Sequence, residues 1–242
     1  MSSLPKRVAA EAVGTALLLC AVVGSGIMGE RLASGNGAIV LLANAVATGA
    51  ALVALILTFG PISGAHFNPA ITLADASQGG LPWSDVPGYV LAQFVGAFAG
   101  VGLANVMFDL PLFFASRHAR NGASQLLSEF VATFGLMAVI WGCVRSRSNL
   151  TAFAVAAYIT AAYWFTSSTS FANPAVTLAR SASDTFAGIH PHNVPAFILV
   201  QLAGAAASTM LFRWLLPTRP RSAEAVIIPH DQRAEAEAPR LL

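Results

Sequence analysis

Two near-copies of one short motif constrain the fold of this chain more than any other feature. The first copy, at 63–74, reads SGAHFNPAITLA, and the second, at 168–179, reads STSFANPAVTLA. Each follows an apolar stretch of the chain. Asn followed by Pro is typical of a helix start, because Asn caps the helix and Pro fits its first turn. We therefore predict that Pro69 and Pro174 each open a short helix.

The composition indicates where these helices lie. Hydrophobic residues make up 56% of the chain and charged residues 10%, whereas a soluble domain carries about 25% charged residues. Several stretches exceed the roughly 18 apolar residues that a membrane-spanning helix needs. We predict an all-α integral membrane protein. The net charge of +2 is too small to indicate nucleic-acid binding.

Six full spans are predicted, at about 8–28, 38–59, 86–107, 124–145, 150–166 and 194–216. After each Asn-Pro pair, only a few helix-compatible residues follow, near 68–76 and 173–182. These segments are too short to cross the bilayer, so we expect two re-entrant half-helices. Irregular backbone at membrane depth survives only where protein buries it or where it lines a watery cavity.

Basic residues predict the orientation. Those at the start of the first span, in the connection between spans four and five, and after the last span fall on one side: Lys6, Arg7, Arg145, Arg147, Arg213, Arg219 and Arg221. Under the positive-inside rule both termini are cytoplasmic. We expect a multi-pass protein of the cell membrane (the inner membrane of a bacterium), with a polar, loosely ordered cytoplasmic tail at 217–242.

The repeat extends beyond the two motifs. Glu11 in span one has a counterpart in Glu129 of span four, and Gln93 in span three has one in Gln201 of span six. We divide the chain into a first repeat at 1–108, a connecting loop at 109–123 and a second repeat at 124–216. Three spans per repeat is an odd number, so the second repeat enters the membrane inverted. Inverted repeats with paired broken helices place a solute path near the bilayer midplane.

On these residues the chain resembles the major intrinsic protein family, the aquaporins and aquaglyceroporins. The resemblance extends from Val8 to Leu216. It implies an aquaporin-like fold, a passive channel for water and small uncharged solutes, a homotetramer with one pore per subunit, no cofactor and no enzymatic activity. A secondary transporter is the alternative, since transporters also use inverted repeats. Concentrative uptake would distinguish it.

The predicted centre of the pore consists of the two Asn-Pro-Ala boxes: Asn68, Pro69, Ala70, Asn173, Pro174 and Ala175. A helix N-terminus carries about +0.5 of an elementary charge, so two facing N-termini disfavour cations there. The side-chain amides of Asn68 and Asn173 offer donors to a passing solute.

Charged and polar residues near the boxes allow two interpretations each. Glu11 and Glu129 are either proton or ion sites or acceptors for backbone N–H groups of the broken loops, and we favour the second. Gln93 and Gln201 are expected to support the same loops. His66 is either a pH sensor at the inner mouth or a side chain that holds local backbone, and we favour backbone support.

The resemblance also implies a narrow filter outside the midplane. Counted by the family's spacing, its four positions are Thr48, Ala161, Ser170 and Val176, of which Ala161 depends on an ungapped loop. The family usually has Arg where this chain has Val176. We expect a wider, neutral filter that passes glycerol, urea-like solutes and metalloid acids such as arsenous acid. In lacking this Arg, the chain is similar to bacterial aquaglyceroporin-like channels associated with arsenic resistance.

Further expectations concern charges and small residues. Arg180 lies one helical turn beyond Val176, and Asp75 holds the equivalent place in the first repeat. We expect Arg180 to raise the potential of an outer vestibule, where it helps to recruit oxyanions, and Asp75 to lower it inside, although snorkelling or local pairing explains both residues more simply. The Gly96–Gly100 pair and the pair Gly204–Ser208 are expected to pack the two halves together.

Overall fold

The computed structural model describes residues 2–146 and 148–216, and this part of the chain is helical without a β-strand. The elements are α1 (Leu4–Leu32), α2 (Gly37–Ser63), α3 (Pro69–Gln78), α4 (Val86–Met107), α5 (Ala123–Arg145), α6 (Thr151–Phe165), α7 (Pro174–Arg180), the 3₁₀ turn η1 (Pro191–Asn193) and α8 (Val194–Leu215). The predicted all-α class is confirmed. The expected tail at 217–242, together with Arg147, lies outside the described residues.

Five of the helices are long and apolar enough to cross a membrane: α1, α2, α4, α5 and α8. Helix α6 has 15 residues, fewer than the predicted full span. It ends early because the backbone becomes extended at Thr166 and leads into the second motif. The predicted segment 150–166 is confirmed as an apolar helix within one residue at each end, and it is shorter than the five helices above.

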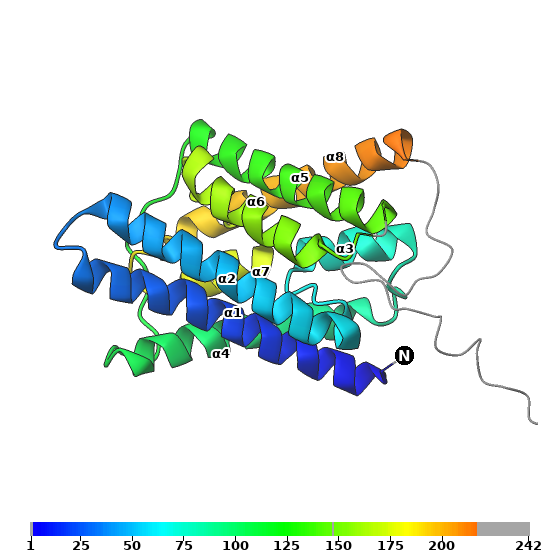
Figure 1. Ribbon diagram of the computed structural model, residues 1–242. Helices are drawn as coiled ribbons and strands as arrows, with labels where there is room; N and C mark the ends of the chain where they lie inside the picture. Colours follow the sequence, from blue (N-terminus) through cyan, green and yellow to red (C-terminus); the bar gives the residue numbers. More distant parts are fainter. Residues whose placement is uncertain (1, 147, 217–242) are drawn as a thin grey trace, which may run out of the picture.

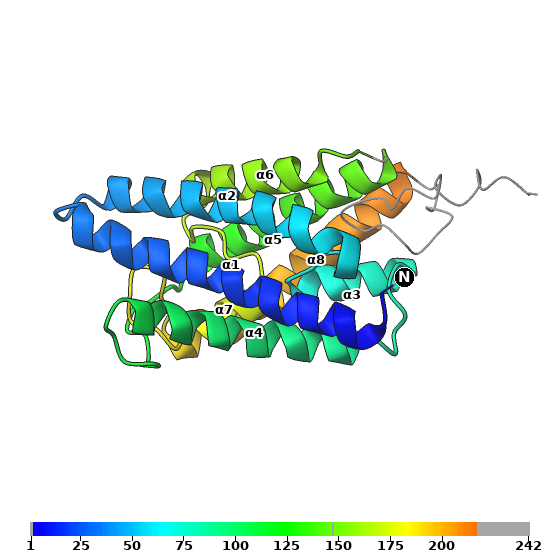
Figure 2. The same ribbon diagram turned by 60° about the horizontal axis from the view of Figure 1, so that its bottom comes forward.

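The helices pack in two equivalent sets. Helix α1 packs against α2 and α4, α5 packs against α6 and α8, and α2 meets α6 where the sets join. Helices α3 and α7 contact each other inside the bundle and lie on opposite sides of its middle (Figures 1 and 2). Helix α3 also packs against α8, and α7 against α4. Helix α3 packs against α4 as well, and α7 against α8, so each half-helix is held by the last long helix of both sets.

Glycines bring two pairs of long helices close together. A Cβ atom at Gly96 or Gly100 of α4 would overlap backbone carbonyls of α1, and a Cβ atom at Gly204 of α8 would overlap the carbonyl of Phe130 in α5. The expectation that these residues join the two halves is wrong. The contacts lie within each half, because α4 pairs with α1 and α8 pairs with α5.

The outer surface is apolar, as in a protein that faces lipid. Leu91, Leu199 and Trp214 are among many large hydrophobic side chains exposed on it. The start of α1 and the end of α8 lie at the same end of the bundle (Figure 1).

Candidate solute pathway

Both half-helices begin at the Asn-Pro pair. Asn68 has extended backbone, and its side-chain oxygen accepts a hydrogen bond from the N–H of Ala70 at 2.9 Å. Asn173 does the same for Ala175 at 2.9 Å. Pro69 and Pro174 occupy the first helical positions, where a missing N–H costs nothing. The capping chemistry of two residue types therefore fixes both helix starts.

The loops before the two helices contain backbone conformations that L-residues rarely adopt. Ala65 and Phe67 before α3, and Thr169, Ser170 and Ala172 before α7, have positive φ values between 49° and 63°. Such conformations cost about 1–2 kcal/mol per residue. They persist only where other contacts hold the chain in place.

Glu11 of α1 provides these contacts for the first loop. Its carboxylate oxygens accept hydrogen bonds from the N–H of His66 at 3.0 Å and the N–H of Phe67 at 2.7 Å. They also accept from the hydroxyl of Ser63 at 2.7 Å and from Gln93 Nε2 at 2.8 Å. The fully buried carboxylate is thus satisfied by donors of the loop and its neighbours.

Glu129 of α5 has the same role in the second loop. Its oxygens accept from the N–H groups of Phe171 and Ala172, both at 2.9 Å, and from Gln201 Nε2 at 2.6 Å. The two buried glutamates therefore occupy equivalent positions and bind equivalent backbone groups.

Two threonines complete the equivalence. Gln93 Nε2 also donates to the hydroxyl of Thr72, and Gln201 Nε2 to that of Thr177, both at 2.8 Å. Each threonine hydroxyl donates in turn to the carbonyl of the capping asparagine, Asn68 or Asn173. These threonines are not among the predicted site residues, although both motif copies read Asn-Pro-Ala-x-Thr. That shared position was the available signal.

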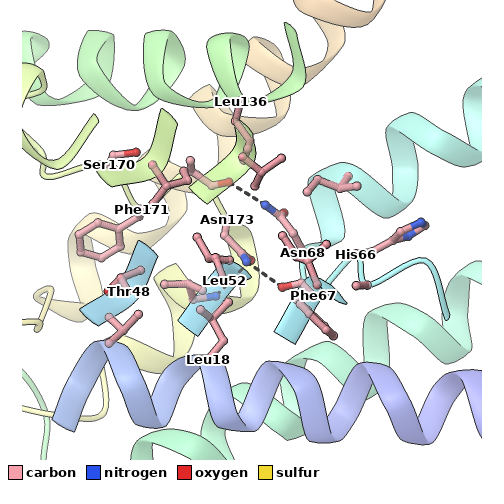
Figure 3. A pocket seen from close by; sticks show the side chains of 18 of the residues that line it. Leu18, Thr48, Leu52, His66, Phe67, Asn68, Leu136, Ser170, Phe171 and Asn173 are labelled. Atoms are coloured by element: carbon pink, nitrogen blue, oxygen red, sulfur yellow. Dashed lines mark hydrogen bonds between the residues drawn. The ribbon is translucent and has the colours of Figure 1, made fainter. Parts of the chain in front are cut away.

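The two Asn-Pro-Ala boxes are joined by two reciprocal hydrogen bonds, which we call the clasp. Asn68 Nδ2 donates to the carbonyl of Ala172, and Asn173 Nδ2 donates to the carbonyl of Phe67, both at 2.8 Å. Figure 3 shows these two bonds side by side between the half-helices. A side-chain amide carries two N–H donors, so each asparagine keeps one donor beyond the clasp. Both residues line the same cavity.

This cavity has a volume of about 60 Å³, which is room for several water molecules. Most of its wall is apolar, with Leu18, Leu52 and Leu136 among the side chains drawn in Figure 3. Its polar groups fall on both sides of the asparagine pair, with His66 on one side and Thr48 and Ser170 on the other (Figure 3). The arrangement is a mostly apolar cavity with a few polar groups along its wall.

Three of the four residues predicted to form the filter border the cavity. Thr48, Ser170 and Val176 line the cavity. Ala161 does not, because it lies on the exposed face of α6. Tyr163, two residues further on, faces the cavity instead, and its hydroxyl lies 3.2 Å from Thr48 Oγ1. The count of twelve residues back from Asn173 thus gives a residue on the outer face of α6, and the nearby residue that borders the cavity is Tyr163.

Ser170 is a polar group without a partner. Its side chain is buried, and no described residue forms a hydrogen bond with its Oγ. A buried hydroxyl without a partner costs free energy unless water or a solute satisfies it. Its place on the cavity wall makes it available to whatever occupies the cavity.

His66 and Asp75 lie together beside α3. Nδ1 of His66 is 3.1 Å from the hydroxyl of Thr72, and Nε2 is 3.7 Å from a carboxylate oxygen of Asp75. The imidazole therefore contacts side chains, whereas the backbone N–H of His66 binds Glu11. Asp75 is buried and does not line the cavity.

Arg180 ends α7 and lies deeper than an exposed vestibule residue. Its side chain is buried, lines the cavity, and places its guanidinium carbon 3.4 Å from the centroid of the Phe171 ring. Its Nε donates to the carbonyl of Ala187.

Apolar helices surround two half-helices that are hydrogen-bonded to each other, next to a mostly apolar cavity with a few polar groups. This arrangement is that of a membrane channel protein. Comparison with known proteins agrees. The sequence model of the family described as "Major intrinsic protein" matches residues 1–159. The chain therefore belongs to the major intrinsic protein family, whose members named below are aquaporins and aquaglyceroporins.

Individual relatives cover most of the chain. "Aquaglyceroporin AqpS" of Rhizobium meliloti (strain 1021) is 53% identical over 218 residues, which span 90% of this chain and 93% of the relative. "Aquaporin NIP1-1" of Oryza sativa subsp. japonica is 33% identical over 220 residues, spanning 86% of this chain and 73% of the relative. The X-ray structure of the aquaglyceroporin from Plasmodium falciparum has the same fold, with a TM-score of 0.65 over 88% of this chain and 95% of that one at 19% identity.

Proposed function

We propose that the chain is a passive channel for water and small uncharged solutes that carry oxygen acceptors, including glycerol, urea-like solutes and metalloid acids such as arsenous acid. The observation that carries the proposal is the cavity that passes both clasped asparagines. The similarity to an aquaglyceroporin over nine tenths of the chain supports it.

The side chains of Asn68 and Asn173 donate hydrogen bonds to the solute in this channel. One N–H of each amide is used by the clasp, and the other is available to an oxygen atom in the passage. The Asn-Pro ends of α3 and α7 also present their partial positive charges toward the same place. Neutral acceptors are favoured there and cations are disfavoured.

The solute class follows from the side chains outside the asparagine pair. Thr48, Tyr163, Ser170 and Val176 form the constriction in our proposal, with hydroxyl groups from three of them. None of these four carries a charge, and Val176 is smaller than the Arg usual in the family. A constriction of this kind passes molecules larger than water that can bind hydroxyl groups.

A secondary transporter requires ionisable groups that are free to couple. Hydrogen bonds of the loops and glutamines occupy both oxygens of the buried Glu11 and Glu129. The buried Asp75 faces His66 and does not line the cavity. We therefore favour the channel. The same proposal includes both termini in the cytoplasm, a place in the cell membrane, and a homotetramer that buries part of the apolar outer surface.

Stopped-flow swelling of proteoliposomes tests the function. We expect water, glycerol and urea to enter faster than in protein-free liposomes, with solute flux proportional to the imposed gradient. Arsenous acid, added as a neutral solute below its pKa, should follow the same behaviour. Uptake against a gradient would instead identify a transporter, and fluxes equal to those of protein-free liposomes would refute both.

A further inference from the structure

Arg180 has a place in the passage that neither the sequence motifs nor the comparisons assign. It lies four residues after Val176 on α7, so the two side chains share one face of the helix a turn apart. Both line the cavity, together with Tyr163 and Ser170. Only 2% of Arg180 is exposed, so it does not snorkel to the surface.

The guanidinium is fixed in position but not saturated. The ring of Phe171 supports it at 3.4 Å, and Nε donates to the carbonyl of Ala187. No described residue accepts a hydrogen bond from Nη1 or Nη2, and neither atom is among the buried polar atoms without a partner. These two nitrogens therefore keep accessible surface, and the cavity is the space next to them.

Arg120 provides an instructive contrast. Its guanidinium also lies over Phe171, at 5.0 Å. Its Nε donates to the carbonyl of Gly188 at 2.8 Å, Nη1 to that of Ser168 at 3.0 Å and Nη2 to that of Phe186 at 3.2 Å. All three nitrogens of Arg120 thus hold loop backbone, and burial lowers the pKa of this arginine. Arg120 holds backbone carbonyls of the outer loops, whereas the terminal nitrogens of Arg180 are available to bind a solute in the cavity.

The charge of Arg180 has no carboxylate to neutralise it locally. No described acidic side chain lies within ion-pair distance of its guanidinium. Glu129 supports the adjacent loop, but its oxygens are bound to the N–H groups of Phe171 and Ala172 and to Gln201. An unpaired cation in an apolar, narrow passage has a long electrostatic reach, because little water screens it.

We infer that Arg180 supplies the positive charge and the N–H donors of the outer constriction, one helical turn beyond the position at which Val176 has none. This inference rests on the proposed channel function and specifies how that channel excludes cations. A guanidinium offers planar paired donors to an acceptor oxygen, so it binds neutral polyols or undissociated oxyacids and repels monovalent cations. The passage at Val176 stays wide, and the charge acts from a turn away.

Potassium leak and solute swelling of the same proteoliposomes test this inference. Removing the charge in Arg180→Gln should raise potassium permeability at least about tenfold while water flux remains. Arg117→Gln is the matched control, because it removes one positive charge from an outer loop. The side chain of Arg117 is 89% exposed and is paired with Asp184. This variant should change neither readout.

Two further variants separate a filter effect from a folding defect. Arg180→Lys keeps the charge without the planar donors, so it should still exclude potassium but pass less glycerol relative to water. Adding Val176→Arg to Arg180→Gln should restore potassium exclusion by returning a cation to the passage. Absence of a leak in a water-conducting Arg180→Gln channel, or a leak in folded Arg180→Lys, would overturn the inference. If the wild-type protein fails to conduct water or glycerol, the proposed function itself is wrong.

Discussion

The hydroxyl groups of Thr48 on α2 and Tyr163 on α6 lie 3.2 Å apart on the wall of the cavity. The contact joins the two helices at which the equivalent sets of the bundle meet. One of the two hydroxyls donates to the other, so the acceptor keeps a hydrogen that can be offered to a solute. Removing the hydroxyl of Tyr163 alters this pair of the proposed constriction while the aromatic ring stays in place.

Replacing Tyr163 by Phe should therefore change selectivity. The ring stays and the hydroxyl is lost, which leaves Thr48 without its partner. We expect glycerol flux relative to water flux to fall about tenfold, the equivalent of one lost hydrogen bond of about 1.4 kcal/mol. Swelling assays measure both fluxes. Ala161→Leu, on the exposed face of the same helix, is the control, and an equal effect there would contradict our placement of the filter.

Replacing Val176 by Arg should narrow the constriction and favour water. The new guanidinium adds volume and donors to the cavity wall and lies one turn from Arg180. We expect glycerol and urea fluxes to fall more than water flux, by about tenfold or more. Val176→Ile adds one methylene without charge and should have a smaller effect. Unchanged selectivity in Val176→Arg would show that this residue does not border the narrowest point.

Replacing Glu129 by Gln should destabilise the protein. The neutral amide cannot accept strong hydrogen bonds from both Phe171 and Ala172 while facing Gln201, so at least one buried donor loses its partner. We expect a loss of about 2–4 kcal/mol, measured as a lower unfolding temperature in detergent. Glu30→Gln is a matched control, because Glu30 also accepts a backbone N–H, that of Phe186, but at an exposed site where water competes. Equal losses in the two variants would refute the assigned role of Glu129.

Replacing Gly100 by Ala should also destabilise the protein, for a steric reason. The added methyl group would overlap the carbonyl of Ala16 in α1, and overpacking of this kind costs about 1–3 kcal/mol. Gly142→Ala in α5 is the comparison, since its new methyl group meets only a Phe212 ring atom at 3.9 Å. It should be neutral or stabilising by up to about 1 kcal/mol, because Ala favours helix. The order of the two unfolding temperatures checks the prediction.

The half-helices and their anchors could be predicted because local chemistry determines them. Asn caps and Pro starts a helix regardless of the surroundings, so both box positions could be read directly. The intramembrane charges of Glu11 and Glu129 require nearby donors, and the interrupted loops offer unpaired backbone N–H groups. The repeat supported these inferences twice, since Asn68, Glu11 and Gln93 each had a counterpart of the same type in the other half.

Other features depend on geometry that the sequence does not encode locally. Tyr163 faces the cavity and Ala161 does not, and residue counting across the irregular loop after Phe165 could not distinguish these two faces of α6. The partner of Gly100 depends on which helices pair, and that is a property of the whole bundle. Arg180 at the end of a short helix looks like a surface residue until the ring of Phe171 and the carbonyl of Ala187 enclose it.

The clasp between the boxes has a consequence for biosynthesis. The carbonyl of Phe67 finds its side-chain donor in Asn173, which is translated after two further long helices. Until that segment emerges, the first re-entrant loop sits in the bilayer with this acceptor unfilled. Both bonds of this pair join residues from the two motif copies, so neither can form before the second copy has been synthesised.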